Sequence, residues 1–270
     1  MNGILDRTLG ILELLAAHVE GLPLAAIADR TNTPRSAVHR LLADLMRHGY
    51  VRQVREQGDY VLTTKLVSMG LTFLSNSGII DIAQPLLDRL AQASGELVRL
   101  SVIDGERLTW VARAQGARRG LRYDPDMGQD AKFSCSASGW AWLSTLSDEK
   151  ALELVGRQGF GSREEFGPNA PATVTELLEQ LRQTRARGFA VTVETFTPGM
   201  TAMAAPVRRA GQEAIGCISV AGPAFRFTEQ RMLALGDELM AVAAELAAIS
   251  GSSPLFYAPA RDRQHVIVST

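Results

Sequence analysis

Residues 33–49 of the chain read TPRSAVHRLLADLMRHG, and this stretch decides the fold of the N-terminal part. Thr33 is typical of a helix N-cap, Pro34 suits a first helical position, and Gly49 is a common helix end. The sequence therefore predicts a helix from Arg35 to Arg47. On a helical wheel the apolar side holds Val38, Leu41, Leu42 and Leu45, and the opposite side holds Ser36, Arg40, Ala43 and Arg47, with His39 at the flank.

Elements on both sides of this helix complete a small domain. Helical periodicity predicts two earlier helices, Ile4 to His18 and Leu24 to Arg30. Alternating residues predict two later strands, Tyr50 to Val54 and Asp59 to Leu62, joined by a turn at Glu56-Gln57-Gly58. Three short helices followed by a hairpin is the order of a winged helix-turn-helix.

Basic side chains gather in this domain although the whole chain is nearly neutral. The 270 residues carry a formal net charge of −1, whereas Pro34 to Arg55 contains five arginines and the single carboxylate Asp44. Arginine on an exposed helix can bond guanine in the major groove, and arginine in a wing can contact phosphates or the minor groove. The residues predicted to contact double-stranded DNA are Thr33, Arg35, Ser36, His39, Arg40, Arg47, Arg52 and Arg55, with Gln57 beside them in the wing. The alternative is a plain three-helix bundle with solvated arginines, which leaves the strand pair unexplained.

A linker helix and a larger domain follow the DNA-binding domain, which we assign to residues 1–62. The sequence predicts a linker helix over residues 63–78, and its apolar residues Leu66, Met69, Phe73 and Leu74 are candidate dimer contacts. Residues 79–250 predict an α+β domain, and residues 251–270 a loosely ordered tail. The predicted helices of the large domain are Ile79–Ala93, Ala137–Thr145, Asp148–Val155, Val174–Arg187 and Thr228–Ile249. The predicted strands are Val98–Ile103, Leu108–Arg113, Leu121–Tyr123, Ala190–Thr195 and Ala214–Val220, grouped as in an antiparallel sheet flanked by helices.

The cysteine count and the hydropathy pattern argue against several classes of protein. Cys135 and Cys217 form no C-x-x-C motif and lie in no Cys/His cluster, so we expect no metal and two unreactive thiols. No stretch approaches 18 consecutive apolar residues, and the N-terminus does not resemble a signal peptide. We therefore expect a cytoplasmic protein with no membrane partner.

An enzyme is the main competing class. The four histidines are His18, His39, His48 and His265, so the large domain holds none that could act as a general base. A winged-helix small-molecule methyltransferase needs a glycine-rich loop after a strand; the nearest candidate, Gly159-Phe-Gly161, lacks both a third glycine and a preceding strand. We expect no catalytic residue and no cofactor. The other alternative is a DNA-binding architectural protein without an effector, a role for which the large second domain is unnecessary.

Short motifs occur in a fixed order along the chain. They are RTLGILELL from Arg7, LAAIADRT from Leu24, PRSAVHRLL from Pro34, GYV from Gly49, AAPV from Ala204 and ISVAGPAFRFT from Ile218. Together they resemble the IclR family of bacterial regulators, over nearly the whole chain to about Ile249. The resemblance implies a transcriptional repressor or activator that binds a near-palindromic operator as a homodimer, or as a tetramer of paired dimers.

The resemblance also implies a GAF-like effector domain that holds a small organic ligand beside the sheet. The family's pocket positions correspond to Ser134, Ala137, Ser138, Thr192, Glu194, Met200, Ala202 and Ser219. The residues themselves indicate a site of this kind, because the run from Ser134 to Gly139 is rich in serine and precedes a predicted helix. The first N–H groups of such a helix can receive a carboxylate.

This chain departs from the commoner family pattern around that pocket. Ser134 and Trp140 stand where a His and a Lys are usual, the pair Thr201-Ala202 where Arg-Cys is frequent, and Ala221 where a second Ser is frequent. The pocket is therefore predicted to be less polar than in relatives that bind very small acids. We expect an aromatic or otherwise bulkier catabolite as effector.

Overall fold

The computed structural model describes residues 3–55, 58–123, 125 and 127–252. The chain divides between Asn76 and Ser77 into two compact units. Glu56 and Gln57 of the predicted turn, and the predicted tail from residue 253 onwards, lie outside the described residues.

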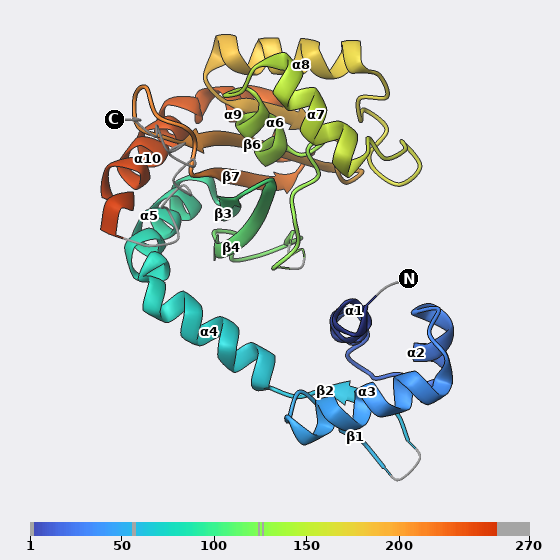
Figure 1. Cartoon of the computed structure of the whole chain (residues 1–270). Helices are drawn as coiled ribbons and strands as arrows, with labels where there is room; N and C mark the ends of the chain where they lie inside the picture. The colour runs from blue at the N-terminus through green and yellow to red at the C-terminus, as the bar shows by residue number, and fades with distance from the viewer. Residues whose placement is uncertain (1–2, 56–57, 124, 126, 253–270) are drawn as a thin grey trace, which may run out of the picture. The chain divides into compact units, whose positions relative to one another are not determined.

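The first unit is a winged helix-turn-helix, as predicted (Figure 1). Its elements are α1 (Ile4–Ala16), α2 (Leu24–Arg30), α3 (Arg35–Arg47), β1 (Val51–Gln53), β2 (Tyr60–Leu62) and α4 (Lys65–Ser77), which runs to the boundary. β1 and β2 pair antiparallel with Val51 opposite Leu62, and Tyr60 also bridges to Leu22. The three helices and the hairpin share one apolar core, which contains Ile11, Leu15, Leu22, Ile27, Ala28, Val38, Leu42, Leu45, Val51 and Tyr60.

The start of α3 differs by one residue from the predicted cap. Pro34 is the N-cap, and Thr33 is buried. The N–H of Thr33 donates to the carbonyl of Ala28 at 3.0 Å, and its hydroxyl donates to the carbonyl of Thr31 at 3.0 Å. Asn32 turns the chain here with a left-handed φ of 47°. Thr33 therefore closes the end of α2 rather than capping α3.

The second unit is an α+β domain built on a five-stranded antiparallel sheet of order β4-β3-β7-β6-β5, which confirms the predicted class. Its strands are β3 (Leu97–Asp104), β4 (Arg107–Gln115), β5 (Ala190–Val193), β6 (Met200–Val207) and β7 (Gly216–Pro223). Its helices are α5 (Ile79–Ser94), α6 (Ala137–Leu143), α7 (Asp148–Gln158), α8 (Val174–Arg187), α9 (Glu229–Ala234) and α10 (Gly236–Ile249), with a 3-10 turn at Ser250–Ser252.

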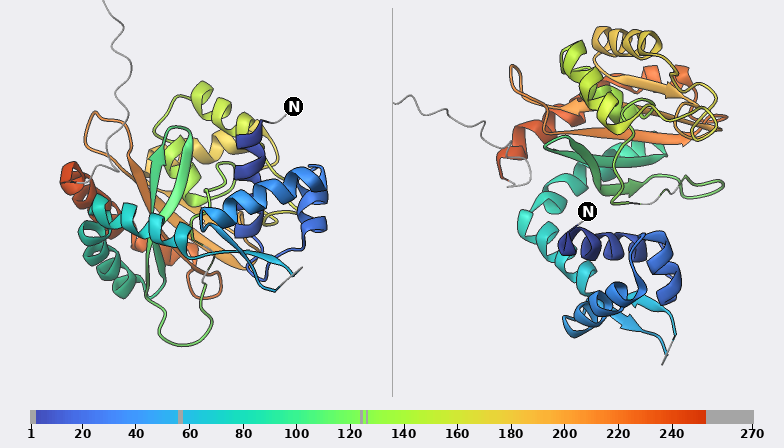
Figure 2. Two further views of the ribbon diagram at one scale, coloured as in Figure 1. Left: turned by 60° about the horizontal axis from the view of Figure 1, so that its bottom comes forward. Right: turned by 45° about the vertical axis from the view of Figure 1, so that its right-hand side comes forward.

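Helices cover both faces of this sheet (Figures 1 and 2). α5 packs on β3 and β4, and α10 packs on β6 and β7, on one face. α6 packs on β5, β6 and β7 from the other face, together with α7 and α8. The apolar core between the sheet and this second group of helices includes Trp110, Phe133, Trp140 and Trp142.

Three predicted details of the second unit are wrong. Leu121–Tyr123 forms no strand. Its backbone carbonyls accept hydrogen bonds from side chains and not from a neighbouring strand: Arg226 Nη1 donates to Leu121 at 2.7 Å, and Gln115 Nε2 donates to Tyr123 at 3.0 Å. Met200–Val207, for which no element was predicted, forms β6 inside the sheet. The final helix breaks at Leu235, where the Phe189 ring lies so close that a Cβ on Gly236 would be 2.5 Å from Phe189 Cε1.

Within the described ranges, no single helix is long and apolar enough to cross a membrane, and only α4 and α5 taken together, as a bent pair, reach the required length and composition.

Candidate functional site

α3 turns a basic face to solvent and buries its apolar side. Val38, Leu42 and Leu45 are buried in the core of the first unit. The exposed residues of the helix include Arg35, Ser36, His39, Arg40 and Arg47. A helix divided in this way has the diameter and the donor groups that a DNA major groove accepts.

The arginines of this region differ in how they are engaged. Arg47 Nη2 lies 2.8 Å from Asp44 Oδ1 in an exposed ion pair one turn along the helix. Arg35 and Arg40 make no ion pair or side-chain hydrogen bond with any residue that the structure describes. Arg52 in β1 and Arg55 just beyond it are also exposed, in the wing. Among the described residues, no side chain pairs with these four guanidinium groups, which can therefore contact an external anion or base edge.

The second unit contains a pocket between the sheet and the start of α6. About 400 Å³ of space in this pocket is not occupied by protein atoms, and part of that space is open to solvent. The pocket is lined by Arg99, Trp110, Tyr123, Ser136, Ala137, Ser138, Thr192, Phe196, Thr197, Met200, Thr201, Ala202, Ser219 and Ala221.

Six of the residues predicted for the effector site line this pocket. They are Ala137, Ser138, Thr192, Met200, Ala202 and Ser219. The strand register explains why three of these come together: Thr192 lies opposite Ala202, Ala202 lies opposite Ala221, and Ser219 lies two residues before Ala221 on the same face.

The other two predicted residues, Ser134 and Glu194, do not line the pocket. Ser134 is buried, and its hydroxyl donates to the carbonyl of Phe160 at 2.5 Å. Glu194 has a left-handed φ of 50°, and its Oε2 accepts from the N–H of Gly199 at 3.0 Å. Its backbone N–H also donates to the carbonyl of Met200. Glu194 thus holds the turn between β5 and β6.

Arg99 is the charged residue among the described residues that line the pocket, and it was not predicted from the sequence. Its side chain lies over Trp110, with the guanidinium carbon 3.9 Å from the ring centroid, and the residue is only 5% exposed. Arg99 Nε and Trp110 Nε1 are both buried, and neither has a hydrogen-bond partner among the described residues. Burial lowers the pKa of Arg99 to about 10, so the side chain stays cationic at neutral pH.

A β-bulge brings Arg99 and Trp110 to the same face of the sheet. Arg99 pairs with Arg113 and Ser101 pairs with Trp110, with a register shift between Leu100 and Ser101. Without that extra residue on β4, alternation would turn Trp110 to the opposite face. The sequence does carry a signal: Arg99 and Ser101 alternate with apolar residues in a strand that is otherwise hydrophobic.

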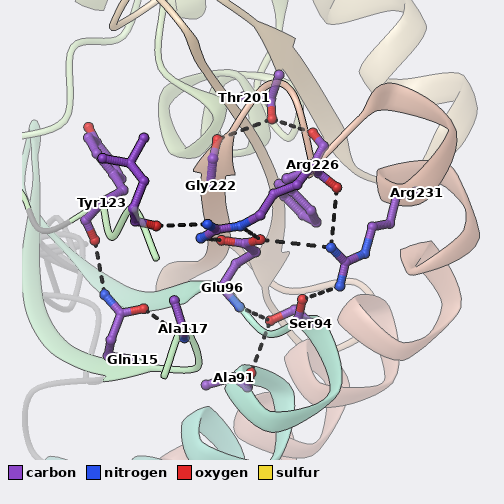
Figure 3. Close-up of polar contacts among 12 residues, drawn as sticks. Ala91, Ser94, Glu96, Gln115, Ala117, Tyr123, Thr201, Gly222, Arg226 and Arg231 are labelled. Carbon is purple, nitrogen blue, oxygen red and sulfur yellow. Dashed lines mark hydrogen bonds and ion pairs between the residues drawn. The ribbon is translucent and has the colours of Figure 1, made fainter. Parts of the chain in front are cut away.

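An ion-pair network borders the pocket (Figure 3). Glu96, at the start of the segment leading into β3, binds Arg226 and also lies 3.8 Å from Arg231. Arg231 Nη2 donates to the carbonyl of Ser94 at the end of α5. Thr201, which lines the pocket, donates to the carbonyls of Gly222 and Phe227. The turn after β7 is therefore fastened both to the pocket wall and to α5.

Comparison with known proteins decides the family. The model of the bacterial transcriptional regulator IclR C-terminal domain matches residues 71–248, and that of the IclR helix-turn-helix domain matches residues 4–55. The chain belongs to the IclR family.

Curated IclR-family relatives are transcriptional regulators. The acetate operon repressor of Salmonella typhimurium is 28% identical over 250 residues, covering 92% of this chain and 90% of the relative. The HTH-type transcriptional regulator BhcR of Paracoccus denitrificans is 32% identical over 242 residues, covering 90% and 85%. This IclR-family chain is accordingly a DNA-binding transcriptional regulator with a C-terminal effector domain, and not an enzyme.

Solved IclR-family structures share the fold. A regulator from Alicyclobacillus acidocaldarius aligns with a TM-score of 0.79 at 21% identity, over 93% of this chain and 100% of that one. An IclR homologue from Microbacterium hydrocarbonoxydans, crystallised with 4-hydroxybenzoate, aligns with a TM-score of 0.74 at 18% identity, again over 93% and 100%.

Two departures of this chain from the commoner IclR pattern contact each other. Trp140 Nε1 donates to the carbonyl of Ser134 at 2.9 Å, deep in the core of the effector domain. The third departure, Thr201, uses its hydroxyl within the protein, and Ala202 and Ala221 leave space in the pocket. At these positions the side chains therefore present few free polar groups to the pocket.

Proposed function

We propose that the chain binds a near-palindromic operator as a homodimer, with α3 of each copy in the major groove. The observation that carries this proposal is that Arg35 and Arg40 are exposed on α3 and unpaired among the described residues. Arg40 would read guanine, with Ser36 and His39 beside it at base edges or phosphates. Arg52 and Arg55 would hold the phosphates beside the wing.

The proposed dimer contact is α4, assigned to the linker segment 63–78. Four large apolar side chains of this helix are exposed: Val67, Met69, Leu71 and Phe73. Met69 and Phe73 lie one turn apart on one side of the helix, and Val67 and Leu71 lie one turn apart on nearly the opposite side. Exposed apolar side chains of this kind are expected to be covered by a partner, and a second copy supplies an identical helix. Two such dimers can associate further into a tetramer.

The proposed effector is a small aromatic catabolite bound in the pocket of the domain at residues 79–250. Trp110, Tyr123, Phe196 and Met200 provide apolar and aromatic walls. The homologue crystallised with 4-hydroxybenzoate supports the same ligand class for this fold. Ligand entry would change how two effector domains pack, and so the spacing of the two DNA-binding domains of residues 1–62. Because its proposed target is bacterial DNA, we expect the protein to act in the cytoplasm.

Footprinting tests the proposal. The purified full-length chain is incubated with DNA flanking its own gene, in about 150 mM salt with excess competitor DNA, with and without small aromatic acids and their neutral analogues. We expect two protected half-sites whose centres are about 34 Å apart or a multiple of that distance, and altered protection with one ligand. The absence of any protected sequence, or protection that no ligand changes, would contradict operator binding or effector control respectively.

A further inference from the structure

Arg99 is an unusual residue for the wall of an apolar pocket. Arginine is almost never fully buried unless an anion or several acceptors accompany it, because removing its charge from water is costly. Arg99 is 5% exposed, and its Nε has no acceptor among the described residues. Stacking on Trp110 offsets part of the cost but satisfies none of the N–H groups.

Among the residues that the structure describes, no counter-charge accompanies this cation. None of the described residues that line the pocket is an aspartate or a glutamate. Glu96, the buried carboxylate at the pocket's border, is bound on both oxygens by Arg226. Among the described residues, Arg99 is thus the one charged side chain that lines the pocket, and no described carboxylate pairs with it.

The geometry also limits the shape of an anion that could bind here. The Trp110 ring covers one face of the guanidinium, so a ligand must approach the edge, where the planar N–H fork matches a carboxylate. Trp110 Nε1 is a second donor in the same wall that has no acceptor among the described residues. Tyr123, Phe196 and Met200 complete the lining with ring and thioether surfaces, which favour a flat unsaturated body.

We propose that the pocket selects a monocarboxylate carrying one aromatic ring, and that Arg99 is the residue that recognises the carboxylate. One buried cation compensates one negative charge, so a dianion would bring an unpaired charge into the site. This inference rests on the proposed effector role of the pocket and specifies the chemical class of the effector.

The first test needs no variant. Calorimetry on the full-length protein compares benzoate with benzamide, which has the same shape without the charge, and with the dianion phthalate. We expect benzoate to bind about 10- to 100-fold more tightly than either, as for a charge-assisted hydrogen bond to a buried group. Equal affinities for benzoate and benzamide would overturn the inference.

The second test changes the residue. Arg99→Met keeps much of the side-chain length and removes the charge; we expect it to lose about 10- to 100-fold in benzoate affinity while benzamide affinity stays within about threefold. Arg99→Lys should recover part of the loss. Without ligand, the melting temperature of Arg99→Met should not fall below that of the wild type, because the change removes an uncompensated buried charge. Unchanged benzoate affinity in Arg99→Met would overturn the assignment, and if the variant fails to fold, the benzoate and benzamide pair on the wild type decides.

Gel shifts with the operator separate this inference from the proposed function. Discrimination of acid from amide without any effect on DNA binding would leave the inference standing and contradict effector control. A neutral ligand that shifts DNA binding, while benzoate does not bind, would support effector control and overturn the inference that Arg99 recognises a carboxylate.

Discussion

Arg226 binds Glu96 through two hydrogen bonds: its Nε lies 2.7 Å from Oε1, and its Nη2 lies 2.8 Å from Oε2 (Figure 3). Glu96 is 2% exposed. A Cβ on Gly222 would lie 2.5 Å from Glu96 Oε2, so only glycine leaves room for the carboxylate. The pair therefore locks the turn after β7 onto the segment that joins α5 to β3.

Replacing Arg226 by methionine should destabilise the effector domain strongly. The change leaves a buried carboxylate with only the more distant Arg231, and loss of one partner from a buried pair costs about 3 kcal/mol. Thermal unfolding measures the effect.

Arg89→Met is the matched control for Arg226→Met. Arg89 pairs with Glu245 at 2.6 Å, but both side chains are 49% exposed, so its melting temperature should stay close to that of the wild type. Equal melting temperatures for the two variants would show that the Glu96 pair does not stabilise the domain.

Glu194→Gln should leave ligand affinity nearly unchanged, although the family resemblance points to Glu194 as a pocket residue. The side chain binds the N–H of Gly199 and does not line the pocket. Ala202→Leu, in contrast, inserts a larger side chain into the pocket and should abolish binding. Calorimetry with benzoate measures both. A large loss of benzoate affinity in Glu194→Gln, with an unchanged melting temperature, would show that this carboxylate belongs to the binding site.

The sequence predicted most elements because their periodicity is strong, and the exceptions have physical causes. β6 was missed because its sequence, MTAMAAPV, has few β-branched residues and contains a proline. Pro206 is tolerated because β5 pairs only with Thr201 to Ala204, so the missing N–H interrupts no ladder on that side.

The pocket was harder to predict than the fold, because strands β3 to β7, the segment at Tyr123 and the start of α6 all contribute to it. Residues near one another in sequence, such as Ala137 and Ser138, could be assigned from a family motif. Arg99 and Trp110 come from β3 and β4, and a bulge decides that they share a face. No local pattern specifies a bulge, so only the folded chain shows that Arg99 and Trp110 lie in the same pocket.

Both thiols should be unreactive in the native protein. Cys135 and Cys217 are free and fully buried. Burial raises the pKa of the Cys135 thiol to about 12 and raises the pKa of Cys217 as well. At pH 8 the thiolate fraction is then on the order of a thousandfold lower than for an exposed cysteine. Mass spectrometry after iodoacetamide should find no native labelling and two labels in denaturant; rapid native labelling would mean that the core opens.

Phe73→Glu should dissociate the proposed dimer. Phe73 is 61% exposed on α4, and a charge there opposes burial against a second copy. Light scattering should give a lower mass, and operator affinity should fall because two half-sites are no longer bound together. Ser75→Glu, an exposed position on the same helix, serves as control. If the mass of the Phe73→Glu protein is the same as that of the wild type, α4 is not the dimer contact.

Arg40→Ala and Arg47→Ala should have unequal effects on DNA binding, although both arginines lie on α3. Arg40 is unpaired among the described residues, so its whole donor fork is available to a base. Arg47 is held by Asp44 at 2.8 Å, and using it on DNA requires breaking that pair. We expect Arg40→Ala to weaken operator binding roughly 10- to 100-fold and to relax base preference at one position, as loss of a bidentate base contact does. Arg47→Ala should weaken binding less and about equally on all sequences. Gel shifts on the operator and on single-base variants at fixed salt measure both, and a larger loss for Arg47→Ala would reverse the assigned roles.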